Sequence, residues 1–213
     1  MKIGNLMMTI RLCIPGMLII VLLSVISCKK EQPIPEKRPV QAINPYSSDS
    51  VFAEVKEKLQ KNPDDVDALY HLADLYDRNG QYAEAIDAYK KVIKLKPDMG
   101  YAYFKMGTAY DRLNQPAEAI NALKKAIKYM PNYAASYNNL GIAYGKLNRF
   151  NEEIAALKKA IKLRPTYSSA RYNLGITYLK TGNKKASMQE YESLKNFDEG
   201  AAEALLKEIK SAS

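Results

Sequence analysis

The sequence has no tryptophan, one histidine, two cysteines and ten glycines among its 213 residues. With a single imidazole, that of His71, no histidine-based metal cluster can form. A histidine-dependent nucleophile would have to be built on that residue alone. The glycines are spread along the chain, so no glycine-rich phosphate loop is present. We therefore predict no enzyme activity, no cofactor, no metal site and no small-molecule substrate.

The sequence also lacks a hydrophobic run long enough for a comfortable membrane span. Residues 12–26 form an apolar stretch of 15 residues after the basic residues Lys2 and Arg11. This pattern predicts a signal peptide over residues 1–27. The ending Val25-Ile26-Ser27-Cys28 resembles the bacterial lipoprotein lipobox, which implies cleavage before Cys28 and lipidation of that cysteine. The alternative interpretation is a signal anchor that is never cleaved.

Cysteine is scarce in a way that agrees with a lipid anchor. Cys13 would leave with the signal peptide, so Cys28 would be the one thiol of the mature chain and no internal disulfide could form. Residues 28–47 contain four prolines among charged and polar residues, and they have too little apolar side chain to fold. We predict a lipidated cysteine followed by a semi-extended linker. A proline-rich ligand motif is the alternative function for this segment.

What the chain does contain is a 34-residue repeat. Four sets of residues keep this step from residue 63 to residue 182, and a period of this size indicates stacked supersecondary units. The sets are a proline (Pro63, Pro97, Pro131, Pro165), a tyrosine (Tyr76, Tyr110, Tyr144, Tyr178), a small residue (Ala73, Gly107, Gly141, Gly175) and a glycine or asparagine (Gly80, Asn114, Asn148, Gly182).

Each repeat has the pattern of a helical hairpin. In residues 66–79, Leu69, Leu72 and Tyr76 lie on one face of a helix. Gly80 and its equivalents stand where a helix ends in a left-handed residue, so we expect a positive φ there. A second helix follows, and Pro97 ends it. Apolar residues at helical spacing predict one further helix at each end, within 48–65 and 202–213.

The repeated residues resemble the tetratricopeptide repeat family. Residues 66–99 carry Leu69, Leu72-Ala73, Tyr76, Ala85, Tyr89, Val92 and Pro97 at that family's signature positions. Residues 100–133, 134–167 and 168–201 repeat the pattern, although Glu153 replaces the small residue found at Ala85, and the last repeat departs at several positions. The resemblance implies an all-α, right-handed superhelical solenoid of four hairpins with N- and C-terminal capping helices.

The same resemblance implies a protein-binding groove along the first helices. Its expected lining is Tyr70, His71, Asp74, Tyr101, Phe104, Asn138, Asn139, Ile142, Tyr172, Asn173 and Ile176. An acidic start at Asp67, Asp74 and Asp77 favours a basic residue at one end of the ligand. Two alternatives remain for single residues: His71 as a polar groove residue that contacts no ligand, and Ile142 and Ile176 as buried contacts between neighbouring helices. The lysine and asparagine clamp that some family members use for chaperone C-termini is not filled, because Phe104 and Thr108 occupy two of its positions.

Lysines also recur with the period, at positions 90, 124 and 158 and at 91, 125 and 159, near the ends of second helices. Cations there favour the helix dipole. The alternative is a basic convex face that binds an anionic envelope surface or a glycan.

We predict no nucleic-acid binding. The expected function is a lipid-anchored scaffold of the bacterial cell envelope that binds a partner segment, possible settings being secretin or pilus assembly and recruitment of cell-wall enzymes. If the bacterium has two membranes, the protein would be anchored in the outer membrane and would face the periplasm.

Overall fold

The computed structural model describes residues 48–212. These residues form ten α-helices and no strand, which confirms the predicted all-α solenoid. The helices are α1 (Ser48–Lys61), α2 (Val66–Arg78), α3 (Tyr82–Leu95), α4 (Gly100–Arg112), α5 (Pro116–Tyr129), α6 (Ala134–Lys146), α7 (Phe150–Leu163), α8 (Ser168–Lys180), α9 (Lys184–Lys195) and α10 (Glu199–Ser211).

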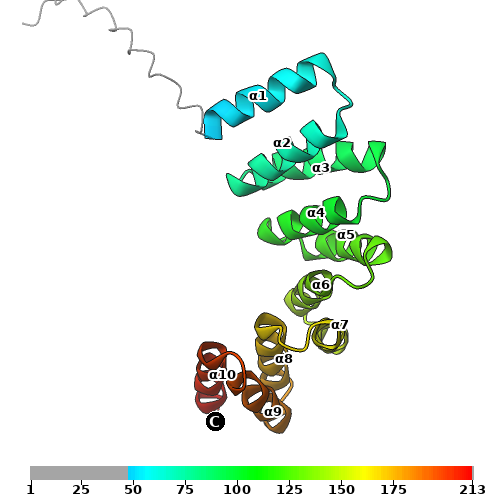
Figure 1. Cartoon of the computed structure of the whole chain (residues 1–213). Coiled ribbons are helices and arrows are strands. Elements are labelled where there is room, and N and C mark those ends of the chain that lie inside the picture. The colour runs from blue at the N-terminus through cyan, green and yellow to red at the C-terminus, as the bar shows by residue number, and fades with distance from the viewer. Residues whose placement is uncertain (1–47, 213) are drawn as a thin grey trace, which may run out of the picture. The chain divides into compact units, whose positions relative to one another are not determined.

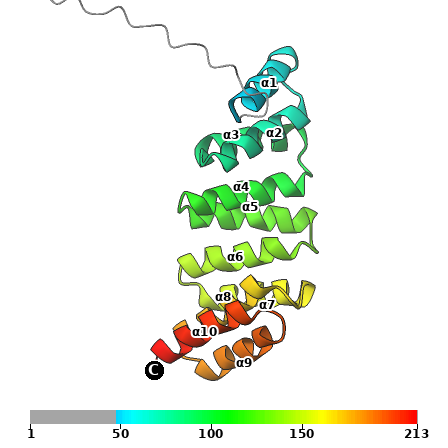
Figure 2. The same cartoon turned by 60° about the vertical axis from the view of Figure 1, so that its left-hand side comes forward.

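Helices pack in the order in which they follow one another along the chain. Each first helix packs on its own second helix, as α2 does on α3 and α4 on α5, and each second helix packs on the next first helix. Figures 1 and 2 show this order from two directions, with α1 at one end of the stack and α9 with α10 at the other. Such a core is built between neighbours and has no single centre.

The turn inside each hairpin has the predicted backbone. Gly80, Asn114, Asn148 and Gly182 have φ of 75°, 56°, 57° and 76°, which confirms the expectation of a positive φ. The residue after each of them donates its backbone N–H to the carbonyl of the periodic tyrosine, over 2.9 Å from Gln81 to Tyr76 and 2.7 Å from Asn183 to Tyr178. This bond satisfies a carbonyl that the helix end would leave unpaired.

The small residues of the first helices allow close packing inside each hairpin. A Cβ atom added at Gly107 would lie 2.8 Å from Cγ of Leu123, and one at Gly141 would lie 2.8 Å from Cγ of Leu157. Both leucines are fully buried. In the fourth repeat Gly175 instead faces Leu205 of α10, so the C-terminal helix fills the space that the second helix fills in the repeats before it.

The terminal helices cover the two ends of the stack with apolar side chains. In α1, Val55 is buried and Phe52 lies 5.2 Å from Tyr76, measured between ring centroids. In α10, Leu205 and Ile209 are buried against α8 and α9. Both helices therefore bury hydrophobic surface that the outermost hairpins would otherwise expose.

The predicted signal peptide, the lipidated Cys28 and the linker up to residue 47 lie outside the described residues. No helix within residues 48–212 combines the length and the apolar character that crossing a membrane requires.

We expect Gly80→Val to lower the free energy of unfolding by more than about 1 kcal/mol, because a β-branched residue is strained at positive φ. No atom lies within 4 Å of a Cβ added there, so the cost comes from the backbone alone. Gly80→Asn is the matched control and should cost less, since asparagine occupies the same turn at Asn114 and Asn148. Equal melting temperatures for the two variants would contradict this account of the turn.

Candidate functional site

The first helices α2, α4, α6 and α8 form one continuous surface, which we name the first-helix face. Helix α6 contacts both α4 and α8, whereas no two successive second helices pack closely within the described part of the chain. The first-helix face is therefore the inner side of the stack. All eleven residues predicted for the groove belong to these four helices, so the fold brings them to one surface.

An aromatic cluster occupies this face where α2, α4 and the start of α6 meet. The ring centroid of Tyr101 lies 6.3 Å from that of Tyr70, 5.7 Å from that of Phe104 and 6.1 Å from that of Tyr133. Phe104 and Tyr133 meet edge to face at 5.0 Å. Burial raises the pKa of the Tyr70 phenol to about 12, so its hydroxyl stays a neutral hydrogen-bond donor. Tyr133 was not predicted, because it precedes the first helix of its repeat.

The carboxylates at the N-terminal end of the face are neutralised within the protein. Nζ of Lys105 lies 2.9 Å from Asp74 and 2.8 Å from Asp77, and Arg78 lies 2.7 Å from Asp74. Burial opposes the charge on Lys105, but hydrogen bonds to the two carboxylates raise its pKa above the ordinary lysine value. The predicted preference for a basic ligand end is therefore wrong for Asp74 and Asp77, whose charges already have partners.

Amide side chains continue the face from α4 to α8. Asn173 donates to Asn138 over 3.2 Å, Asn138 donates to Asn139 over 3.1 Å, and Asn139 donates to the Thr108 hydroxyl over 3.3 Å. Asn138 is only 4% exposed, so it supports its neighbours and does not face a ligand. Asn139 and Asn173 are half-buried and each keeps hydrogen-bonding capacity beyond this chain of bonds.

Two hollows lie on the first-helix face. One, of about 390 Å³, is lined by Tyr70, His71, Asp74 and Tyr101 together with Val51 of α1, and His71 is exposed at its edge. The other, of about 210 Å³, is lined by Ile142, Asn173 and Ile176. Ile142 and Ile176 are half-buried, so they contribute apolar surface to the hollow, although Ile176 also packs on the C-terminal core with Tyr172.

A buried carboxylate beneath the second hollow was not predicted as part of the site. Glu153 of α7 is 5% exposed, and its Oε2 has no hydrogen-bond partner among the described residues. The carboxylate lies against Gly145, where an added Cβ would come within 2.6 Å of Oε1. The sequence held the signal for this arrangement, since Glu153 replaces the small residue of other repeats and Gly145 replaces Asp77, Asp111 and Leu179.

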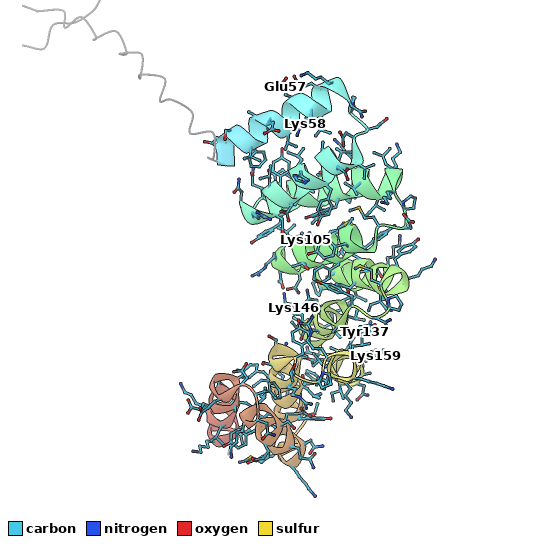
Figure 3. The ribbon with its side chains drawn as sticks, viewed as in Figure 1. Glu57, Lys58, Lys105, Tyr137, Lys146 and Lys159 are labelled. Carbon is cyan, nitrogen blue, oxygen red and sulfur yellow. The ribbon has the colours of Figure 1, made fainter. Side chains whose placement is uncertain are left out.

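Several periodic lysines of the second helices lie over tyrosine rings of the first helices. Lys124 stands 5.9 Å from the Tyr144 ring and Lys158 stands 5.8 Å from the Tyr178 ring. Lys159 lies 5.9 Å from Tyr137, and Figure 3 shows these two side chains together. A cation over an aromatic ring stabilises the fold by about 0.5–1 kcal/mol at an exposed site. This contact gives the lysine rows a structural role.

Within residues 48–212, no cluster of histidine, cysteine or acidic side chains is arranged to hold a metal ion. The first-helix face offers the exposed ring of Tyr101, half-buried aromatic and amide side chains, and two hollows.

Family models described as tetratricopeptide repeat match residues 66–99, 104–168 and 156–189, which together exceed half of the chain. No curated protein matches the sequence.

Solved structures of repeat proteins superpose on most of the chain. The crystal structure of MamA matches with 26% identity and a TM-score of 0.68, over 76% of this chain and 91% of MamA. YrrB, described as a tetratricopeptide repeat protein with an unusual peptide-binding site, matches with 20% identity and a TM-score of 0.66, over 75% of this chain and 84% of YrrB. PilW, described as a type IV pilus biogenesis factor, matches with 22% identity and a TM-score of 0.67, over 78% of both chains. The likenesses to YrrB and PilW concern the fold.

We expect the ionisation of Glu153 to weaken the folded state. Burial raises the pKa of Glu153 above the ordinary value of 4.5, and the Thr177 hydroxyl and the Lys180 charge only partly offset this. Between pH 4.5 and the raised pKa, the folded chain binds more protons than the unfolded chain, so stability from this group falls as pH rises. The melting temperature of Glu153→Gln minus that of the wild type should therefore increase across this window.

Glu152→Gln is the matched control for that measurement. A hydrogen bond from Arg149 lowers the pKa of the exposed neighbour Glu152, so ionised Glu152 stabilises the folded state above its unfolded pKa. The Glu152→Gln difference should change in the opposite direction as pH rises toward 4.5, and it should stay constant in the window above 4.5 where the Glu153→Gln difference increases. A difference in melting temperature between Glu153→Gln and the wild type that stays constant across the pH window would contradict the assignment of an unfavourable buried carboxylate.

Proposed function

This chain belongs to the tetratricopeptide repeat family, and we propose that its first-helix face binds an extended segment of a partner protein. Membership of the family makes the chain a non-enzymatic scaffold for contacts with segments of other proteins. The observation that supports this particular face is its aromatic cluster, in which Tyr101 is 41% exposed beside a hollow of about 390 Å³.

The two ends of the face recognise different parts of a segment. At the N-terminal end, the rings of Tyr70, Tyr101 and Phe104 take an apolar or aromatic side chain, because large anchors in pockets usually dominate binding. Toward α8, Asn139 and Asn173 hydrogen-bond the backbone of the segment. The internal pairing of Asp74 and Asp77 with Lys105 keeps this surface close to neutral, so binding depends mainly on apolar burial and hydrogen bonds.

The scaffold acts from a membrane in this proposal. The sequence motif at residues 25–28 supports a lipid on Cys28, and the proline-containing residues 29–47 connect it to the repeats. The chain would then hold its partner at the surface of the bacterial envelope, facing the periplasm where there are two membranes. Secretin or pilus assembly and recruitment of cell-wall enzymes are the settings that we propose, and PilW, a pilus biogenesis factor by its description, shares the fold.

The rival function is binding of an anionic envelope surface or glycan by the basic convex face. The contacts of Lys124, Lys158 and Lys159 with tyrosine rings give these three lysines a structural role without a ligand, so we favour the first-helix face. Ionic strength distinguishes the two functions. Recovery of a partner bound to the first-helix face should persist at high ionic strength, whereas the affinity of a lysine surface for its ligand should fall steeply.

Tyr101→Ser should abolish recovery of the partner in a cross-linking capture from native membranes, because it removes the exposed anchor of the aromatic cluster. Tyr129→Ser is the matched control, since Tyr129 is 38% exposed and stacks on Tyr103 at the end of α5, away from the first-helix face. The control should retain recovery. Loss with Tyr129→Ser and retention with Tyr101→Ser would instead locate binding on the second helices.

Cys28→Ser should move the protein from the membrane fraction to the soluble fraction, or leave an uncleaved precursor, because the side chain that carries the lipid is gone. Cys13→Ser is the control, since Cys13 lies within the segment predicted to be removed. That variant should be processed and fractionate with membranes as the wild type does. A fully processed Cys28→Ser protein that stays on the membrane would disprove the anchor.

A further inference from the structure

The buried carboxylate of Glu153 results from an exchange of volume within the third repeat. The equivalent positions in the other repeats hold Ala85, Ala119 and Ser187, none of which has a charge to bury. Glu153 fits only because Gly145 leaves space, since a Cβ at residue 145 would lie 2.6 Å from Oε1 of the carboxylate. The two substitutions act together and replace a packing contact with a carboxylate beneath the groove.

This exchange is unfavourable for folding alone. Oε2 is buried without a hydrogen-bond partner among the described residues, and a buried acceptor left unsatisfied keeps its full desolvation penalty. Burial also raises the pKa of Glu153. An alanine, as in two neighbouring repeats, would avoid both effects. The carboxylate is therefore better explained as part of a binding site than as part of the core.

The hollow above Glu153 has the other components of a site, and we name it the Glu153 pocket. It measures about 210 Å³, and Lys146 and Lys180 complete its lining with Gly145, Asn173 and the two isoleucines. Lys146 lies 2.6 Å from Asp111, which neutralises it, and Figure 3 shows Lys146 near the middle of the stack. Lys180 is exposed, and its charge acts on Glu153.

The ligand must offer a donor to Glu153 and an acceptor to Lys180 without adding charge. An ammonium group would satisfy Glu153 but would meet the like charge of Lys180, and a carboxylate would satisfy Lys180 but would be repelled by Glu153. A primary carboxamide has both functions in one neutral group, with two N–H donors and a carbonyl acceptor. The apolar walls of Ile142 and Ile176 suit the methylene groups that carry it.

We propose that the Glu153 pocket binds the carboxamide of a glutamine or asparagine side chain of the partner segment, an inference that rests on the proposed function of the first-helix face. The Glu153 carboxylate, which lines the pocket, accepts a hydrogen bond from the amide NH₂, and Lys180 donates to the amide oxygen. The pocket thereby selects which residue of the segment lies over the third repeat.

The test needs no knowledge of the partner. The full chain, labelled with ¹⁵N, is titrated with N-acetyl-glutamine methylamide, and amide resonances are followed by NMR. The glutamate and lysine methylamides are the comparison probes, because they share its backbone. The glutamine probe should shift resonances of α6, α7 and α8 saturably, and the other two should bind at least about tenfold more weakly, as expected for loss of a hydrogen bond to a charged group.

Two variants of the pocket and one control accompany the titration. Glu153→Ala should remove the response to the glutamine probe, and Glu153→Gln, which keeps the size of the side chain, should weaken it. Glu152→Ala, at the adjacent residue paired with Arg149, should leave it unchanged.

No response at α6–α8, equal binding of the three probes, stronger binding of the lysine probe, or an undiminished response in Glu153→Ala would each overturn the proposal. None of these outcomes would affect the proposed function, which is tested separately by recovery of the partner with the Tyr101→Ser and Tyr129→Ser variants.

Discussion

The contact between the two helices of one hairpin sets the geometry on which the rest of the molecule depends. At Gly107 and Gly141 the first helix has no side chain, and a buried leucine of the second helix fills that space at distances that a Cβ would forbid. Each second helix then supports the first helix of the next hairpin. Because a small residue recurs at this position every 34 residues, equivalent positions of successive first helices come to lie beside one another.

That register explains the polar chemistry of the first-helix face. Residues at one repeat position reach back to the preceding repeat, as Lys105 does to Asp74 and as Asn139 does to Thr108. The bonds are ionic near α2 and change to amide contacts toward α8. The face is thus already ordered before a partner binds, which reduces the entropy lost on association. Binding then depends on the aromatic cluster around the exposed ring of Tyr101 and on the two hollows.

The repeat, its helices and its positive-φ turns could be predicted from the sequence because each depends on local residues such as Gly80 and Pro97. The residues of the first-helix face could be predicted too, since the resemblance to the tetratricopeptide repeat family assigns those positions of each first helix to the groove. Which of those residues are free to contact a ligand could not be predicted, because that depends on contacts between repeats. Lys105 neutralises Asp74 and Asp77, and Asn138 is buried beneath its neighbours. The relation between Gly145 and Glu153 required the packing of α6 on α7, although both departures from the repeat pattern stand in the sequence.

The central claim is that the partner segment lies on the first-helix face, and site-specific photo-crosslinking in the native membrane tests it most directly. A photoreactive residue at Ser169, which is exposed in α8 at the position equivalent to Tyr101, should form an adduct with one partner. The same residue at Ala155, exposed in α7, should form none with that partner. An adduct at Ala155 together with none at Ser169 would contradict the claim and transfer the binding surface to the second helices.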